Sequence, residues 1–127
     1  MHSAPEDLRT LTLENEEYRR VHETHKGLAQ LVLMSIPPGG TIPVEVHPET
    51  TQFIRSEQGR ALVTRDGQTD ILQEDGYVFI VPGVEHEVVN DGDVDLKLYT
   101  IYYPPEHEPG LVQRTQPIKE INVPLLF

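Results

Sequence analysis

Three side chains that can bind a metal ion lie close together in the stretch EVHPETTQ, namely Glu45, His47 and Gln52. Glu45 and His47 are two residues apart in a segment whose sequence is typical of a strand. Successive strand side chains alternate between faces, so these two side chains point the same way. Gln52 follows a turn that contains Pro48 and begins the next predicted strand. A hairpin at this turn would place Gln52 beside His47.

His86 is the fourth candidate ligand, at the start of a later predicted strand that follows Pro82-Gly83. If that strand lies beside residues 43–47, the four side chains converge on one point. Two imidazoles and one carboxylate form the ligand set that suits divalent iron and its neighbours, and Gln52 would add a neutral oxygen. The net charge of such a centre is near +1, which favours an anionic or bidentate oxygen ligand. The ion could polarise a carbonyl, activate water or bind oxygen.

Each candidate also has an ordinary structural alternative. A single histidine is more often a surface residue or a satisfied core residue than a metal ligand. An isolated glutamate is usually solvated, and a neutral amide binds transition metals weakly. The alternative to a metal centre is therefore a barrel interior that is polar but holds no ion.

The elements that position these residues are short, because eleven prolines and nine glycines interrupt the 127 residues. One short helical turn is predicted near residues 4–13, and the rest of the pattern is typical of strands separated by turns. Strands are predicted at residues 17–23, 28–36, 43–47, 52–56, 60–65, 70–73, 77–81, 86–90 and 95–103. The segment 77–81 is apolar on both faces, which predicts a central strand. Asp66-Gly67 is a strong hairpin signal.

Many short strands at regular spacing predict an all-β sandwich or barrel. The length predicts one domain over residues 1–127. The apolar end of the tail, residues 123–127, is expected to pack on the barrel or on a second subunit.

The composition excludes several classes of protein and site. With 10 basic and 21 acidic residues the formal charge is −11, so nucleic acid is not expected as a partner. There is no cysteine, which excludes disulfides and thiolate sites. The sequence has no apolar run long enough for a membrane span, and MHSAPEDLRT does not resemble a signal peptide. We therefore expect a cytoplasmic protein that does not bind membranes.

Two segments resemble the two motifs of the cupin family. The first is Gly39-x5-Glu45-x-His47-x4-Gln52-x6-Gly59, and the second is Gly76-x5-Pro82-Gly83-x2-His86-x3-Asn90. The resemblance covers about residues 17–109, and it implies a motif core at about 17–110 with an N-terminal arm and a C-terminal tail. It is especially close to a group of small single-domain cupins that carry stretches similar to VLMSIPPGG and LKLYTIYYPPEHEPG.

The sequence departs from the usual cupin pattern at three points. Glu45 stands where the family usually has histidine, and Gln52 stands where it usually has glutamate. The second motif is one residue shorter between Pro82 and His86. The two exchanges move the ligand carboxylate without deleting it, so the total ligand charge equals that of the usual three-His-one-Glu set.

The resemblance implies a double-stranded β-helix, which is a small jelly-roll barrel, and a homodimer. It also implies a divalent metal, such as Fe, Mn, Ni or Zn, in the barrel. The implied metal ligands project into the barrel: Glu45, His47, Gln52 and His86. The predicted apolar lining is Met34, Ile54, Val88 and Leu98.

Two functions follow from this pattern. One is a metal-dependent enzyme of dioxygenase, isomerase or decarboxylase type, acting on a small oxygen-bearing metabolite. The other is a non-catalytic module that binds or senses a small ligand or a metal. No residue stands out as a general base. His107 and the hydroxyl of Tyr102 are predicted to have structural roles, and His22 and His25 are predicted to lie at the surface.

Overall fold

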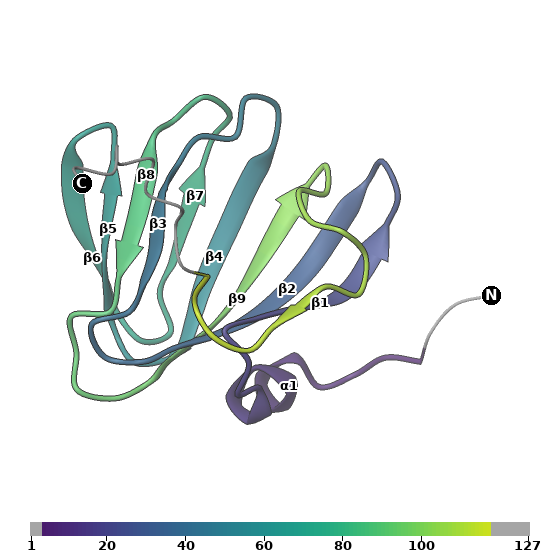
Figure 1. Cartoon of the computed structure of the whole chain (residues 1–127), viewed down its shortest axis with the longest axis horizontal. Coiled ribbons are helices and arrows are strands. Elements are labelled where there is room, and N and C mark those ends of the chain that lie inside the picture. The colour runs from purple at the N-terminus through teal and green to yellow at the C-terminus, as the bar shows by residue number, and fades with distance from the viewer. Residues whose placement is uncertain (1–3, 118–127) are drawn as a thin grey trace, which may run out of the picture.

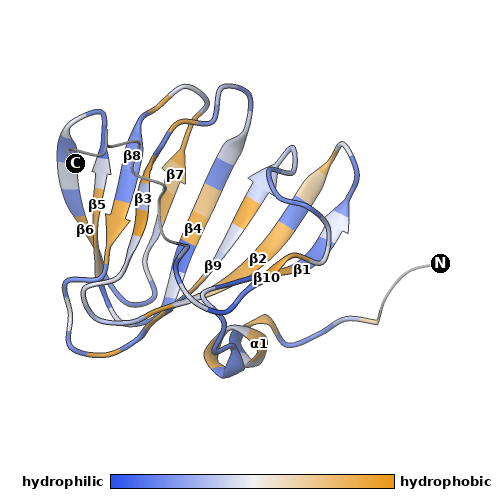
Figure 2. Ribbon diagram, viewed as in Figure 1, coloured by the Kyte–Doolittle hydropathy of each residue, from blue (hydrophilic) through white to orange (hydrophobic). Residues whose placement is uncertain are grey.

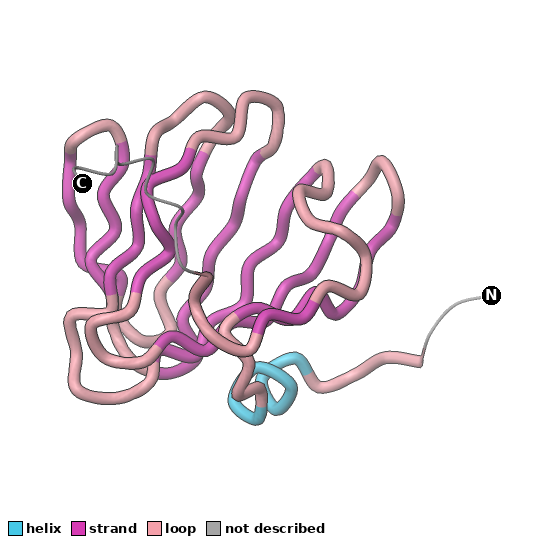
Figure 3. The backbone as a smooth tube through the Cα atoms, in the orientation of Figure 1, coloured by secondary structure: helices cyan, strands magenta, loops and turns pink. Residues whose placement is uncertain are grey.

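The computed structural model describes residues 4–117, and the apolar segment 123–127 lies outside the described residues. The described part is built mainly of strands, with one short helix (Figure 3). The elements in chain order are α1 (Leu8–Glu14), β1 (Arg19–His25), β2 (Ala29–Ile36), β3 (Thr41–Glu45), β4 (Thr51–Gln58), β5 (Ala61–Arg65), β6 (Gln68–Leu72), β7 (Tyr77–Ile80), β8 (His86–Val89), β9 (Leu96–Tyr103) and β10 (Val112–Gln113).

The strands form two antiparallel sheets, shown in Figure 1. One sheet has six strands in the order β10-β1-β2-β9-β4-β7, and the other has four in the order β3-β8-β5-β6. Some strands that are consecutive in sequence, such as β3 and β4, therefore lie in different sheets, whereas β1 and β2 are paired neighbours, as are β5 and β6. This arrangement confirms the predicted all-β fold and its double-stranded β-helix.

Residues alternate along each strand between the interior and the outer face, and the inward-facing ones line the space between the sheets. Figure 2 shows the strands banded in orange and blue accordingly. The four residues predicted to line the barrel are fully buried there: Met34, Ile54, Val88 and Leu98. Burial of each such aliphatic side chain stabilises the fold by roughly 1.5–3 kcal/mol.

The predicted Asp66-Gly67 hairpin is also confirmed, since it joins β5 to β6 with positive φ at both residues (49° and 82°).

Helix α1 lies outside the barrel against β9, β4 and β2. The Asp7 carboxylate caps its start by accepting a hydrogen bond from the Thr10 amide at 3.0 Å. Lys97 on the outer face of β9 donates to the Asn15 carbonyl at the end of the helix at 2.7 Å. The helix predicted near residues 4–13 is confirmed with its bounds shifted a few residues along the chain.

The prediction of a central strand at residues 77–81 is wrong. Strand β7 lies at the edge of the six-stranded sheet, beside β4. Tyr77 and Phe79 are 64% and 44% exposed, and they pack on Phe53 on the outer face. A strand that is apolar on both faces was expected to be covered on both faces. Here the outward apolar side chains form an aromatic surface cluster instead.

Among residues 4–117 there is no helix both long enough and apolar enough to span a membrane.

Candidate metal centre

Strands β3 and β8 bring the first candidate ligands together. They are antiparallel neighbours, and Glu45 at the end of β3 lies directly opposite His86 at the start of β8. The prediction that these two segments are adjacent is therefore confirmed. His47 lies just beyond the end of β3, in the connection to β4. The intervening Val44 and Val46 are half-exposed, as the predicted alternation requires.

Gln52 reaches the interior from the opposite sheet. The predicted hairpin between its strand and residues 43–47 is wrong, because β3 and β4 belong to different sheets. The segment between them crosses the end of the barrel, so Gln52 and Glu45 come from facing walls. Sequence spacing alone could not distinguish a hairpin from such a crossing.

Glu45 is the point on which the two histidines converge. Its Oε1 lies 3.1 Å from His47 Nε2 and 3.3 Å from His86 Nε2. One ligand atom from each of the three residues lies within 4.8 Å of the others, a spacing that one metal ion can bridge. His47 and His86 are 8% and 1% exposed, whereas Glu45 is half-buried. The group therefore lies inside the barrel and faces solvent on the Glu45 side.

The hydrogen bonding of His86 favours a cation at this point. Its Nδ1 lies 2.9 Å from the Val84 carbonyl oxygen, which can only accept, so Nδ1 carries the proton. In the neutral imidazole Nε2 then presents a lone pair toward Glu45, and this buried atom has no hydrogen-bond partner among residues 4–117. Two acceptors that face each other need a proton or a metal ion between them. This donor set fits a divalent metal.

His47 is held between two carboxylates. Nε2 faces Glu45, while Nδ1 lies 3.4 Å from Glu106 Oε2. A carboxylate on the far nitrogen of a metal-binding histidine fixes its tautomer and raises its basicity. Sequence reasoning missed Glu106. The available signal was its place in PPEHEPG, directly after the last long strand.

The charges at the centre reinforce this picture. Burial raises the pKa of Glu45, but its contacts with His47 and then His86 outweigh burial and lower it to about 2. Burial lowers the pKa of His47, but Glu45 and then Glu106 more than compensate and raise it. The carboxylate of Glu45 is therefore ionised at neutral pH and attracts a cation.

Gln52 is fully buried, and its amide orientation is fixed. Nε2 donates to Thr100 Oγ1 at 3.1 Å and to the Tyr102 hydroxyl at 3.2 Å. Its Oε1 is buried without a hydrogen-bond partner in the described part of the chain. The Tyr102 hydroxyl has a partner, as predicted. An unpaired acceptor fits the fourth ligand position assigned to Gln52, which stays a prediction.

The segment that follows β9 is fastened over the barrel by Gln30. This buried side chain accepts from the amides of Glu106 and His107 at 3.3 and 3.0 Å. It also donates to the His107 carbonyl at 2.7 Å and to Thr24 Oγ1 at 3.0 Å. One amide thus fixes the backbone that carries Glu106 and His107.

The sequence predicts a structural role for His107, but its ring lies close to the candidate metal centre. Its ring meets Tyr102 edge-to-face at 5.1 Å, and Tyr102 in turn meets His47 at 5.8 Å. His107 Nε2 is buried and unpaired among the described residues. Burial, followed by the charge of Arg19, lowers the pKa of His107 to about 4, so the ring is neutral at pH 7.

The other two histidines considered from sequence do not join the centre. His25 is exposed and pairs with Glu23, and the partly exposed His22 pairs with Glu6.

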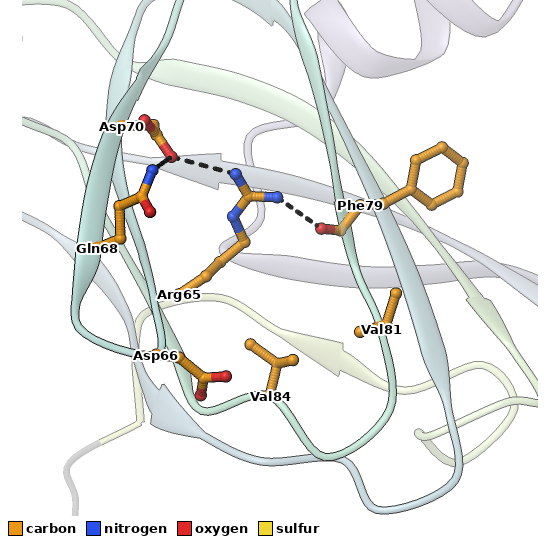
Figure 4. Close-up of a pocket in the computed structure, with 7 residues that line it drawn as sticks. All are labelled: Arg65, Asp66, Gln68, Asp70, Phe79, Val81 and Val84. Atoms are coloured by element: carbon orange, nitrogen blue, oxygen red, sulfur yellow. Dashed lines mark hydrogen bonds and ion pairs between the residues drawn. The ribbon is translucent and has the colours of Figure 1, made fainter.

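A cavity of about 360 Å³ lies beside the loop that precedes His86, lined by the residues shown in Figure 4. Arg65 spans it, with hydrogen bonds to Asp70 Oδ2 and the Phe79 carbonyl, each at 3.1 Å. Asp66 donates its amide to the Glu85 carbonyl and accepts from the Glu85 amide through Oδ1. These contacts tie the β5–β6 turn to the residue next to His86. We therefore assign these contacts the role of positioning His86.

The family model for the cupin domain matches residues 32–102, which includes all four candidate ligands. The chain belongs to the cupin family. An uncharacterised protein of Acanthamoeba polyphaga mimivirus is 40% identical over 115 residues, which are 87% of this chain and 71% of that protein. The uncharacterised protein YrkC of Bacillus subtilis is 38% identical over 111 residues, and the chain spans only 59% of its length.

A solved structure supports the same fold. The crystal structure of BH2720 from Bacillus halodurans superposes with a TM-score of 0.86 at 35% identity, covering 90% of each chain. The present cupin thus combines a shared barrel with a Glu/His/His group that can hold a metal. The predicted homodimer and small-molecule partner stay predictions.

Proposed function

We propose that this cupin holds one divalent transition metal in its barrel and uses it to bind a small oxygen-bearing molecule. The proposed ligands are Glu45, His47, Gln52 and His86. The observation that carries the proposal is the meeting of both histidine Nε2 atoms on Glu45 Oε1, with the His86 lone pair otherwise unpaired. The unpaired Oε1 of Gln52 supports the fourth position.

The donor set favours iron, manganese, nickel or zinc. Imidazole nitrogen suits iron, nickel and zinc, and the carboxylate and amide oxygens add hard donors that manganese also accepts. A bound divalent ion would supply a Lewis-acid centre inside the barrel. The protein's own contribution is to hold His47 through Glu106 and to hold His86 through the Val84 carbonyl.

The proposed activity is that of a dioxygenase, isomerase or decarboxylase acting on such a molecule. The neutral imidazole of His107 favours this activity, because the ring nitrogen that carries no hydrogen can accept a proton while the other nitrogen donates a hydrogen bond. Sequence reasoning did not identify this proton acceptor. A non-catalytic binding or sensing module is the second candidate. It is favoured by the pairing of Glu106 with His47 Nδ1, because a carboxylate that is already paired with a ring nitrogen is not free to act as a base.

Metal analysis of protein purified without added metal tests the proposed centre. We expect close to one equivalent of transition metal in the wild type and a large loss in both Glu45→Ala and His86→Ala. His25→Ala is the matched control, because it removes an exposed histidine far from the group. A wild type that holds no more metal than the two site variants would contradict the centre.

Oxygen consumption by the iron-loaded protein then separates the two candidate functions. A panel of diketones and catechols presents two adjacent oxygens to the centre. Turnover of any member that depends on His107 supports an enzyme. Tight binding with no turnover across the panel supports the binding module.

A further inference from the structure

Arg19 is a buried cation on the inner face of β1. The exposed Arg20 separates it from Val21, and Arg19 and Val21 are 7% and 4% exposed. This alternation directs the Arg19 side chain into the barrel and the Arg20 side chain away from it. Two adjacent arginines on one strand therefore have opposite environments.

The charge of Arg19 has no counter-ion in the described part of the chain. Nη1 donates to Gln113 Oε1 at 2.5 Å, and the guanidinium lies 5.3 Å from the centre of the Tyr18 ring. No carboxylate of residues 4–117 lies within 4.0 Å of it, and the buried Nε has no hydrogen-bond partner there. Buried charges are normally paired, because desolvation is otherwise expensive.

The guanidinium faces the same interior as the candidate metal centre. Val21, on the same face of β1 as Arg19, belongs to one buried core with Tyr102, and the Tyr102 ring meets both His47 and His107. His107 Nε2 is itself buried and unpaired. Two kinds of unsatisfied atom therefore share this space. Gln52 Oε1 and His86 Nε2 are acceptors that suit a cation, whereas Arg19 Nε is a donor that suits an anion.

We propose that Arg19, assisted by His107 Nε2, is a binding site for a carboxylate on the small molecule that this cupin takes up. A guanidinium matches a carboxylate with two parallel N–H···O bonds and cannot lose its charge. The neutral His107 ring can donate one further hydrogen bond to the same group. The ligand class is thus a small carboxylic acid that also carries oxygens able to chelate a metal. This last step rests on the proposed function.

Paired probes test the subsite by calorimetric titration of the zinc-loaded protein. The diacids 2-oxoglutarate and 2-oxoadipate are compared with 2-oxopentanoate and 2-oxohexanoate, which keep the chain length and the 2-oxo acid end but lack the second carboxylate. We expect the wild type to bind at least one diacid about tenfold or more tightly than its partner. Arg19→Met is expected to remove that preference and to leave binding of the monoacids unchanged.

Arg20→Met is the matched control, because it removes the neighbouring, outward-facing arginine of the same strand. It should keep the preference. Arg19→Lys retains the charge without the planar fork and should keep only part of the preference. The proposal would be overturned if the metal-bound wild type did not prefer the diacid over the monoacid at either chain length. A preference for the diacid that survives Arg19→Met would overturn it as well.

Two parallel measurements separate this proposal from the proposed function. Metal content is measured on every variant, and Arg19→Met should retain the wild-type metal. If the wild type binds no metal, the centre fails, and the subsite is judged on apo protein by thermal shift with glutarate against sodium chloride of equal ionic strength. A glutarate-dependent rise in Tm that Arg19→Met lacks supports the subsite, and no rise overturns it.

Discussion

Two levels of the barrel interior, four residues apart along the same strands, satisfy their polar groups very differently. At one level Leu98 of β9 lies between Met34 and Ser56, and at the other Tyr102 lies between Gln30 and Gln52. At the first level, Ser56 donates to the Gly59 carbonyl at 2.7 Å.

Asn90, which lies toward the same apolar level, is also fully paired. Its amide donates to the carbonyls of Ile36 and Val94, and its oxygen accepts from the Gly92 amide. At the second level, buried atoms of three residues have no partner in the described chain, namely Gln52, His86 and His107. Unpaired buried polar groups reduce stability. The apolar level therefore maintains the fold, and the polar level is organised to receive an ion and a ligand.

Leu98→Ala should produce the largest effect on stability in this comparison. It removes a fully buried side chain from the apolar level, and the free energy of unfolding of apo protein should fall by about 2–5 kcal/mol. Urea denaturation followed by circular dichroism measures this change. Metal affinity of the folded variant should stay near the wild-type value. A variant that keeps its stability but loses its metal would break the distinction between the two levels.

Glu106→Ala acts on the polar level and should show the reverse pattern. Without the carboxylate at His47 Nδ1, metal affinity should fall about 10–100-fold. The stability of apo protein should change by at most about 1 kcal/mol, because the pair is partly exposed. Competition with a chromophoric chelator measures the affinity. Glu108→Ala, two residues along the same segment, is the control and should match the wild type.

Gln52→Glu restores a carboxylate at the fourth position and sharpens the assignment of that residue. A second anionic ligand should raise metal affinity on the order of tenfold, equivalent to about 1.4 kcal/mol. Apo protein should become less stable at neutral pH, because two buried carboxylates then repel each other. Opposite signs for the two effects are the expected result. Unchanged metal affinity would place Gln52 outside the ligand set.

The last prediction concerns His107 and pH. Its pKa in the folded protein is about 4, below its ordinary value of 6.5, so between these values the unfolded chain binds the extra proton. Its contribution to stability is therefore fully present above pH 6.5 and is lost as the pH falls toward 4. His107→Asn should lose less stability than the wild type between pH 7 and 4.5. Parallel losses in urea titrations would show that this ring does not titrate as described.

The sequence allowed part of this polar level to be predicted. Alternation along a strand correctly placed Glu45 and His47 on one face, and the cupin motifs supplied the pairing of their strand with that of His86. Local patterns carry this information because the spacing of side chains along a strand is fixed. The same rule could not show that Gln52 faces them from the other sheet, since a turn and a crossing look alike in sequence.

Local sequence patterns could not identify the roles of Arg19 and Glu106. Arg19 lies at the start of the first strand and Glu106 lies after the last long one, so only the closed barrel brings them near the centre. The error at β7 has a related cause. Apolar residues on both faces of 77–81 indicate burial, but Tyr77 and Phe79 cover an outer surface whose environment the sequence does not specify.

The contacts of Asp66 limit the changes in length that the β5–β6 turn can accept, in engineering and in evolution. Asp66 holds both backbone groups of Glu85, the residue that precedes His86. A two-residue hairpin turn at the surface is ordinarily a convenient place for an inserted tag or a length change. Here a lengthened turn would release the residue beside a candidate ligand. Descendants of this chain are therefore expected to vary in surface charge at this turn before they vary in its length.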